Sequence, residues 1–288
     1  NTWLDGSHND DNTLSFRNVL LDLTDEPTVK PHNRNYFSHN TLGYDYDPQA
    51  ECKEWLKFLD SLDWTDSLIG LLQEAMGYLL TVDCTPQKII LLLGRSRAGK
   101  SVITTVCSKL VGECNTSSPS FESLIKDSTK HELSKKLLAL IPEITQPHPS
   151  KSQELFGVTK AMSGNAAITF DRKFKGMQTN SRWCKIVSTA NTMPTFDDPS
   201  GALANRFLIF PFTKSFRGVE DYGLEARLDK EIAGIMNWAI AGLKRLQANG
   251  MRFTEVDEVV ELVNDTRRDM FPLADFVDDC CIVAVRER

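Results

Sequence analysis

Apolar residues follow different spacings along the chain and so divide it into segments. Residues 1–46 are rich in Asn, Asp, Thr and Tyr and hold only short alternating pieces, which predict small strands and turns. Helical spacing follows: Asp47-Pro48 predicts the start of one helix, and a second helix is expected from about Thr65. The inward positions expected for the first helix are Cys52, Trp55, Leu56, Leu59 and Leu62. Residues 47–87 therefore form a small helical section whose apolar stripes are explained by core packing.

Short continuous apolar runs replace the helical spacing after residue 87. They cover residues 88–93, 137–141, 184–189 and 207–210. Runs of this kind are typical of parallel strands that are buried on both faces. Because polar and helical stretches separate most of them, the sequence predicts an α/β core with a parallel central sheet over residues 88–213.

Helical spacing returns after the last apolar run. One strongly periodic helix is predicted over residues 224–246, with Gly250 past its end, as the main element of a C-terminal helical part over residues 214–250. An acidic helix over residues 256–266 begins the last segment, 251–288, which we expect to be the start of a truncated further domain. Since the chain also lacks an initiator Met, we expect it to be a fragment of a longer protein.

Composition excludes several classes of protein. A chain of 288 residues with 41% hydrophobic residues builds a proper core, which excludes intrinsic disorder. Its net charge of -6 argues against a uniform nucleic-acid coat but leaves room for a local basic patch. Seven scattered cysteines without a Cys-x-x-Cys pair predict a reducing compartment, with neither disulfides nor structural zinc. No apolar run approaches the ~20 residues of a membrane span and no secretory signal begins the chain, so we expect a cytoplasmic protein without a membrane partner.

A glycine-rich motif lies between the apolar run at 88–93 and an amphipathic stretch at 102–110. It reads Gly-x-x-x-x-Gly-Lys-Ser from Gly94 to Ser101, and its strand and helix context is the one that a phosphate loop requires. The glycines let backbone amides turn toward phosphate oxygens, and the helix presents its positive end. Lys100 is placed to neutralise the β and γ phosphates, and the Ser101 hydroxyl is a ligand for Mg2+. The expected nucleotide-binding residues are Gly94, Arg95, Ser96, Arg97, Ala98, Gly99, Lys100, Ser101 and Val102.

Two polar residues follow other apolar runs, at the expected tips of neighbouring strands. Glu143 is a candidate catalytic acid that holds Mg2+, directly or through water, or orients the attacking water. Pro142 stands where a first carboxylate is common, so the usual acidic pair is missing. Asn191 offers both a donor and an acceptor to a γ-phosphate or a water. The alternatives are a solvated Glu at a strand end and a turn-forming Asn close to Pro194.

A basic segment and an arginine complete the candidate chemistry. Alternation between two glycines predicts an extended hairpin over residues 163–176. Residues 171–186 contain one acidic residue and five basic residues, which are Arg172, Lys173, Lys175, Arg182 and Lys185. This excess suits a nucleic-acid backbone, with Phe170 or Phe174 stacking on bases, although a solvated basic face has the same composition. Arg206 precedes the last apolar run, either as a surface residue or as an arginine supplied in trans to a phosphoryl group.

Taken in chain order, the phosphate loop, Glu143, the basic hairpin, Asn191 and Arg206 resemble the motifs of superfamily 3 helicases. The resemblance is closest to the helicase part of phage and plasmid primase-helicases, a group with relatives among poxvirus replication helicases, and it spans roughly residues 15–275. Its most specific segments are residues 94–101, 162–173, 188–194 and 234–239. Asn165 departs from the pattern, since many relatives have Asp there, and this leaves the local polar contacts of the hairpin open.

The resemblance implies an AAA+-type ATPase that uses ATP and Mg2+ to unwind DNA. It makes Lys100, Glu143, Asn191 and Arg206 the catalytic residues, Arg206 acting on the nucleotide of a neighbouring subunit. It places Lys173, flanked by Arg172 and Lys175, at the hairpin tip against single-stranded DNA. It also implies a homo-hexamer, 3′ to 5′ translocation, and replication of a phage, plasmid or other mobile element in a bacterial or phage-infected cell, with a primase domain or protein as partner.

Two other functions are consistent with the sequence. A P-loop kinase of a small molecule would need a lid and an acceptor site, and single-stranded DNA would not stimulate it. A nucleotide-switched oligomerisation module would bind nucleotide without steady turnover, which the absence of a carboxylate at Pro142 keeps open. ATP turnover measured with and without single-stranded DNA distinguishes all three functions.

Overall fold

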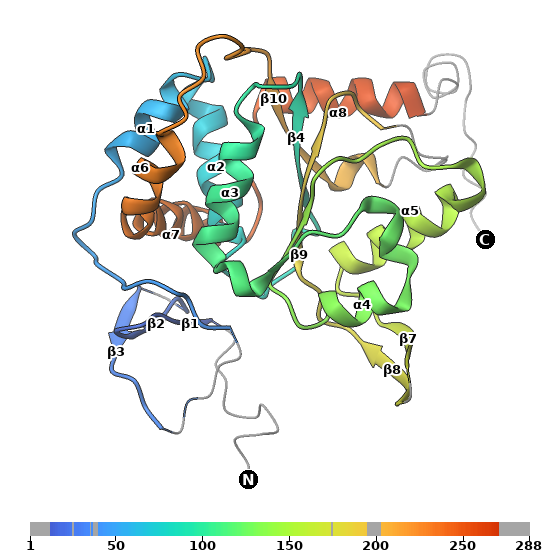
Figure 1. Ribbon diagram of the computed structural model, residues 1–288, viewed down its shortest axis with the longest axis horizontal. Helices are drawn as coiled ribbons and strands as arrows, with labels where there is room; N and C mark the ends of the chain where they lie inside the picture. Colours follow the sequence, from blue (N-terminus) through green and yellow to red (C-terminus); the bar gives the residue numbers. More distant parts are fainter. Residues whose placement is uncertain are drawn as a thin grey trace, which may run out of the picture.

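The computed structural model describes residues 12–24, 26–34, 36, 40–173, 175–194 and 203–270, with side chains to residue 265. Its centre is a five-stranded sheet in which every neighbouring pair is parallel (Figure 1). The strands, in spatial order, are β10 (Phe207–Phe212), β4 (Ile89–Gly94), β9 (Lys185–Ala190), β6 (Leu138–Ile141) and β5 (Thr116–Ser117). The predicted α/β core with a parallel sheet is therefore confirmed, preceded by the predicted helical section.

Both faces of the sheet are covered by helices, which explains the continuous apolar runs. Ile90 and Leu92 of β4 belong to a hydrophobic cluster with the helices on one face, whereas Ile89 and Leu91 belong to a second cluster on the other face. The first face carries α1 (Lys53–Asp60), α2 (Asp66–Tyr78), α3 (Lys100–Val111), α6 (Leu224–Lys230) and α7 (Ile232–Ala248). The second face carries α4 (Asp127–Leu133), α5 (Pro149–Ser163) and the short 3-10 helix Phe121–Ile125. A strand buried on both sides needs apolar residues at successive positions rather than at alternate ones.

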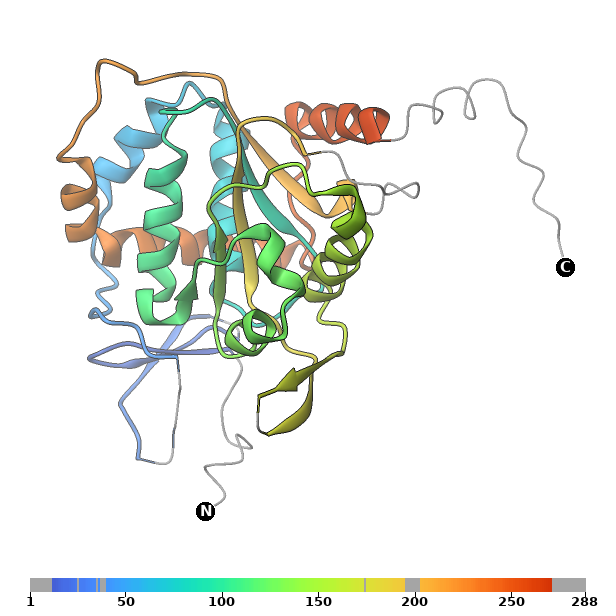
Figure 2. The ribbon, with the colours of Figure 1, turned by 45° about the vertical axis from the view of Figure 1, so that its right-hand side comes forward.

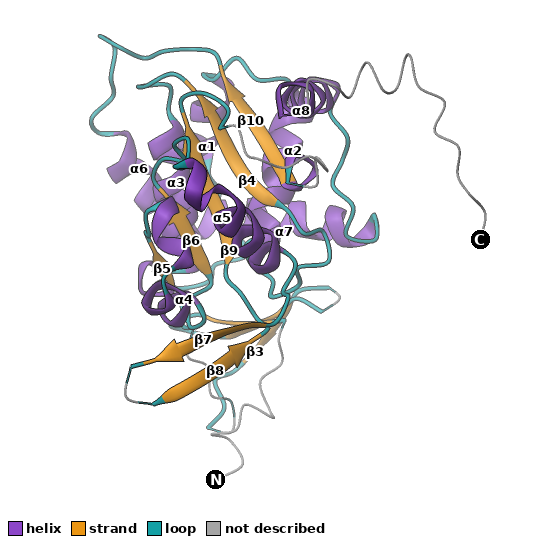
Figure 3. Ribbon diagram, turned by 90° about the vertical axis from the view of Figure 1, so that its right-hand side faces the viewer, coloured by secondary structure: helices purple, strands orange, loops and turns teal. Residues whose placement is uncertain are grey.

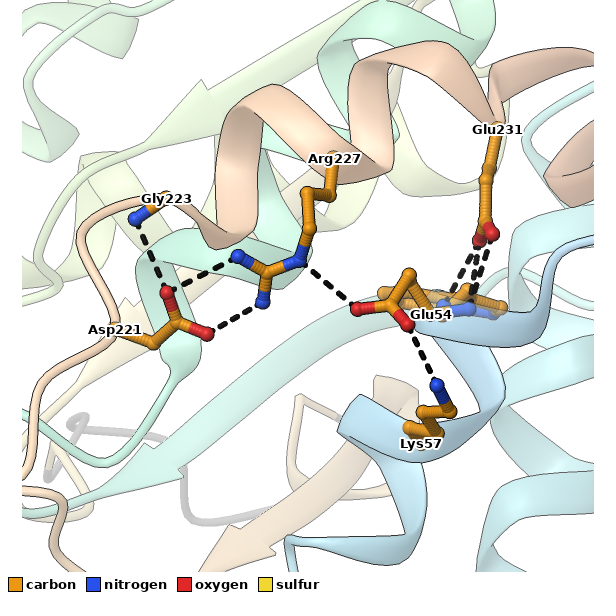
Figure 4. Close-up of polar contacts among 7 residues, drawn as sticks. Glu54, Lys57, Asp221, Gly223, Arg227 and Glu231 are labelled. Carbon is orange, nitrogen blue, oxygen red and sulfur yellow. Dashed lines mark hydrogen bonds and ion pairs between the residues drawn. The ribbon is translucent and has the colours of Figure 1, made fainter.

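Two predicted helix boundaries are wrong, and Glu231 joins the two places. The expected helix at residues 224–246 is broken into α6 and α7 at Glu231, and α1 begins at Lys53 instead of near Asp47. The Glu231 carboxylate accepts hydrogen bonds of 2.9–3.1 Å from the backbone amides of Glu54 and Trp55 (Figure 4). These amides lie in the first turn of α1, where they have no partner within the helix. Asp47 instead accepts from the amide of Gln49 in a local turn.

Helices α2 and α7 cross at very close range. A Cβ added at Gly77 of α2 would lie 2.5 Å from the backbone nitrogen of Leu243, and one added at Gly242 of α7 would overlap the carbonyl oxygen of Gln73. Only a residue without a side chain lets the two backbones approach this closely. The crossing holds the helical section against the C-terminal helical part.

Smaller elements flank this body. A three-stranded antiparallel sheet of β1 (Thr13–Ser15), β2 (Leu20–Asp22) and β3 (Thr28–Lys30) confirms the small strands predicted near the start of the chain. Tyr44 joins this sheet to the end of α3. Its carbonyl accepts from the amide of Arg17, between β1 and β2, and its hydroxyl donates to the carbonyl of Leu110 at 2.7 Å. Helix α8 (Asp257–Met270) lies along β10, and Val256 and Val259 are buried in the first cluster. No helix in the described ranges has the length and apolar character needed to cross a membrane.

Candidate functional site

The glycine-rich motif forms a turn between β4 and α3, as its sequence context predicts. Gly94 and Gly99 have φ values of 149° and 98°, in the region that favours glycine, and Arg97 also has a positive φ of 61°. A Cβ at Gly94 would overlap the carbonyl oxygen of Phe212 on the neighbouring strand β10, so this position has no room for a side chain. Helix α3 then begins at Lys100, with its first amides directed back toward the loop. The motif thus has the backbone geometry of an anion cradle.

The amine of Lys100 lies between the loop and the tip of strand β9. Its Nζ donates to the carbonyls of Gly94 and Arg95, the second at 2.9 Å, and to Oδ1 of Asn191 at 3.2 Å. Partial burial lowers the pKa of Lys100, while the negative charge of Glu143 acts in the opposite direction. The amine is therefore close enough to Glu143 to interact with it electrostatically.

Asn191 connects Lys100 to Glu143. Its Nδ2 donates to Oε1 of Glu143 at 2.9 Å, while its Oδ1 accepts from Lys100. The reason lies in the strand order: β9, which ends before Asn191, runs between β4 and β6, whose ends lead to the phosphate loop and to Glu143. Parallel strands present their carboxyl ends at one edge of the sheet, where ligands bind in open α/β sheets. The structure thus brings together the three residues that the sequence placed separately at strand tips.

Thr189, whose role the sequence did not indicate, holds the segment that carries Glu143. Its hydroxyl donates to the carbonyl of Pro142, and its own carbonyl accepts from the amide of Ile144 at 2.8 Å. These two bonds fix both neighbours of Glu143 to strand β9. The available signal was a threonine near the end of an apolar run, where a hydroxyl needs a partner.

The site offers oxygen ligands to a cation but few of them. Ser101 lies exposed at the start of α3, and Glu143 is exposed beyond β6. Among the described residues no group of three or more His, Cys, Asp or Glu side chains could hold a metal ion. One hydroxyl and one carboxylate fit Mg2+ bound to a nucleotide, because Mg2+ in such sites takes most of its ligands from phosphates and water.

Arg206 lies at the amino ends of the parallel strands, whereas the phosphate loop lies at their carboxyl ends. It precedes Phe207, which pairs with Ile89 at the beginning of β4. Its Nη1 donates to the carbonyl of Lys160 at 3.0 Å and to the hydroxyl of Ser163 at 2.7 Å, both in the last turn of α5. The structure therefore does not bring Arg206 to the phosphate loop of its own chain, and joins it instead to the helix that leads into the hairpin.

A hairpin is present but lies further along the chain than the predicted residues 163–176: it consists of β7 (Ile168–Arg172) and β8 (Gly176–Asn180) and projects from the body of the molecule (Figure 2). Asn165 has a positive φ of 51°, and its Oδ1 accepts from the backbone amide of Trp183 at 2.9 Å. The indole of Trp183 donates in turn to the carbonyl of Ala166 at 3.0 Å. These contacts close the base of the hairpin and give the polar role of Asn165 that the sequence left open.

Two residues expected to face nucleic acid are buried. Phe170 is 1% exposed and packs near the rings of His131 and Trp183, so stacking on bases is wrong for this residue. Lys185 is 4% exposed and donates to the carbonyl of Asp83 and to Sγ of Cys84, so it does not belong to the basic surface. Lys173 and Lys175 are exposed and Arg172 is half-buried, while Phe174 lies outside the described residues.

A loop from the C-terminal part also reaches the phosphate loop, which the sequence did not indicate. Arg97 forms an ion pair with Glu220, and its carbonyl accepts from the amide of Phe216 at 2.8 Å. Residues 213–223 therefore hold the phosphate loop at Arg97, through both its side chain and its backbone.

Two family models match parts of the chain. One is described as a family of unknown function, DUF5906, and matches residues 92–206, which include the phosphate loop, the hairpin and Arg206. The other is described as D5 N terminal like and matches residues 5–64.

Solved structures of the C-terminal region of NrS-1 share the fold. An A-form apo structure is 14% identical with a TM-score of 0.55 and is matched over 77% of this chain and 53% of that one. An apo structure of its residues 305–718 is 13% identical with a TM-score of 0.57, over 80% and 58% of the two chains. This chain thus spans little more than half the length of those proteins, and at such identity the likeness shows the fold alone. The D5 N-terminal-like match is the finding that supports a relation to phage primase-helicase-like proteins.

Proposed function

We propose that the chain is the ATPase motor of a DNA helicase of the superfamily 3 type, acting in replication of a phage or another mobile element. The observation that carries the proposal is the hydrogen-bonded series Lys100–Asn191–Glu143 beside the phosphate loop. A cation for phosphate, an amide for water or γ-phosphate, and a carboxylate for the attacking water are the parts that ATP hydrolysis needs. The relation to primase-helicase-like proteins and the basic hairpin favour DNA as the partner of this motor.

In the proposed reaction, the amides of residues 94–101 and the amine of Lys100 bind the β and γ phosphates. Ser101 and Glu143 would hold Mg2+, Glu143 directly or through water, and the ion supplies neutralising charge when it is bound. The Glu143 carboxylate orients the attacking water and accepts its proton, while Asn191 connects that water with the γ-phosphate. Thr189 holds the Glu143 segment in place through the carbonyl of Pro142.

Arg206 is proposed to act on the nucleotide of a neighbouring subunit in a homo-hexamer. Its position at the edge of the sheet away from its own phosphate loop supports action in trans. Its bonds to Lys160 and Ser163 offer a route to DNA, because α5 leads directly into the hairpin that carries Arg172, Lys173 and Lys175. A change at Arg206 on hydrolysis would thus reach the hairpin through the end of α5. We further propose 3′ to 5′ movement, a primase domain or protein as partner, and action in the cytoplasm of a bacterial or phage-infected cell.

ATP turnover with and without single-stranded DNA tests this function. We expect single-stranded DNA to stimulate turnover and Lys100→Ala to abolish it, because the variant loses the phosphate-neutralising amine. Lys173→Ala should lose both the stimulation by DNA and the unwinding of a tailed duplex. Lys230→Ala, on the exposed surface of α6, is a matched control that should behave as the wild type.

Two results would contradict the proposal. Nucleotide binding without turnover, with assembly that depends on nucleotide, would indicate the oligomerisation module that the missing carboxylate at Pro142 keeps open. Turnover that requires a small-molecule acceptor and ignores DNA would indicate a kinase.

A further inference from the structure

Helix α4 and the hairpin form one surface of the molecule. The amide of Asp171 in β7 donates to Oδ2 of Asp127 at the start of α4, at 3.1 Å. The ring of His131 on α4 lies 6.2 Å from the ring of Phe170, centroid to centroid. Figure 3 shows the two elements side by side below the central sheet. The hairpin is therefore docked on α4 at its base rather than standing alone.

Strand alternation directs one basic residue of the hairpin toward this helix. Phe170 is buried on the face of β7 that contacts α4, whereas Thr169 and Asp171 are exposed on the other face. Arg172 is two residues beyond Phe170 and shares its face. The half-buried Arg172 thus faces the α4 side, where Lys135 follows directly after the helix.

The joint region is basic in an acidic chain. Residues 126–136 and 171–175 contain seven basic and three acidic residues, a local net charge of +4 against -6 for the whole chain, and one of the seven, Lys130, is buried. Asp127 is paired with Lys130. When this pair is set aside, six basic residues remain in these two segments against the two acids Glu132 and Asp171.

His131 shows that the basic groups from both elements converge. Partial burial and the positive charges of Lys135, Arg172 and Lys175 all lower the pKa of its imidazole. Like charges held near one another on a folded surface repel, and the phosphates of a polyanion relieve this repulsion while the polyanion's counterions are released. The arrangement suits a ligand with regularly spaced negative charges.

We propose that Lys135 and Arg172, with Lys175, form a second contact for the sugar-phosphate backbone of single-stranded nucleic acid, beside the hairpin tip. This proposal rests on the proposed function, which places the same strand on Lys173. Lys135 belongs to the α4 side and not to the hairpin, so it extends the contact from the hairpin onto the body of the subunit.

Binding of a fluorescein-labelled oligo-dT to the full chain, measured by anisotropy at several salt concentrations, tests the proposal. Loss of one backbone contact on a single strand lowers the slope of log affinity against log salt by about 0.7, which is roughly fivefold in affinity near 0.1 M salt. We expect Lys135→Ala to show both changes and Lys135→Arg to retain wild-type values, since it keeps the charge. Lys230→Ala is the control, because α6 lies on the opposite face of the sheet from α4 (Figure 1).

The outcomes separate this proposal from the function on which it rests. If Lys135→Ala binds with wild-type affinity and salt slope while Lys173→Ala is weakened, the contact beside α4 is refuted and the helicase proposal stands. If neither variant changes binding, or the wild type does not bind the oligonucleotide, the proposed function itself fails. A loss with Lys135→Ala that Lys135→Arg does not restore would show a structural effect and also refute the contact.

Discussion

Asn191 lies with its amide nitrogen 2.9 Å from the carboxylate of Glu143, at the edge of the sheet that also carries the phosphate loop. Because the same side chain accepts from Lys100, it fixes the distance between a positive and a negative group that would otherwise pair directly. The amide therefore keeps the carboxylate available for water and the amine available for phosphate.

Replacing Asn191 by Asp should harm catalysis while leaving the shape of the site intact. The new carboxylate would repel Glu143, and it would lack the N–H that donates to the Glu143 carboxylate. We expect kcat for ATP to fall about 100-fold, because Glu143 loses the donor that positions it. Steady-state ATP turnover checks this, and a wild-type kcat in the variant would speak against the relationship.

The hydroxyl of Thr189 should matter for catalysis although it does not face the nucleotide. Thr189→Val keeps the shape of the side chain but leaves the carbonyl of Pro142 without its donor. We expect kcat to fall about tenfold, or roughly 1.4 kcal/mol, with KM for ATP little changed. Thr189→Ser should restore the rate, because it restores the hydroxyl. A wild-type kcat in the valine variant would show that Glu143 is positioned by other contacts.

Mixing two inactive variants tests whether Arg206 acts in trans. Lys100→Ala and Arg206→Ala subunits should each be inactive, yet a mixed assembly contains interfaces that combine an intact Lys100 with an intact Arg206 from the neighbour. We expect DNA-stimulated ATP turnover to return on mixing under conditions that allow subunit exchange. If the mixture stays as inactive as its components although mixed assemblies form, Arg206 acts within its own chain, as the anchor of α5.

The crossing of α2 and α7 should tolerate no added methyl group. Gly77→Ala would press a Cβ against the backbone of Leu243, and we expect a loss of about 1–3 kcal/mol in the free energy of unfolding. Gly157→Ala in α5 is the matched control, because no atom lies within 4 Å of its added Cβ. That variant should gain up to about 1 kcal/mol from higher helix propensity. Denaturant unfolding of both variants checks the contrast, and equal stabilities would contradict the close approach.

Local sequence patterns predicted the strands better than the contacts between distant segments. The runs that became β4, β6, β9 and β10 are apolar because both of their faces are covered, and this is visible in sequence. Strand β5 has only two residues, Thr116 and Ser117, and no such run marks it. Lys185 is charged and yet buried. Local patterns could not predict this, because its partners Asp83 and Cys84 lie about a hundred residues earlier in the chain.

The residues of the candidate site likewise divide into those that local patterns predict and those that depend on contacts between distant segments. The phosphate loop, Glu143 and Asn191 were found because each follows an apolar run, and their meeting at one edge follows from parallel strands. The role of Thr189 and the burial of Phe170 depend on which element packs alongside, which no local spacing reveals. The roles of Lys100, Glu143, Asn191 and Arg206 in catalysis stay predictions for the experiments above.

Because Glu231 caps α1, completion of this helix depends on a residue far along the chain. The amide of Glu54 and the carboxylate that it needs are separated by 177 positions, so the first turn of α1 stays incomplete until Glu231 has been synthesised and has reached it. Contacts of such long range are slow to form, because the intervening chain must first be brought together. Helix α1 should therefore be among the last elements to gain protection from hydrogen exchange, even though it precedes the central sheet along the chain.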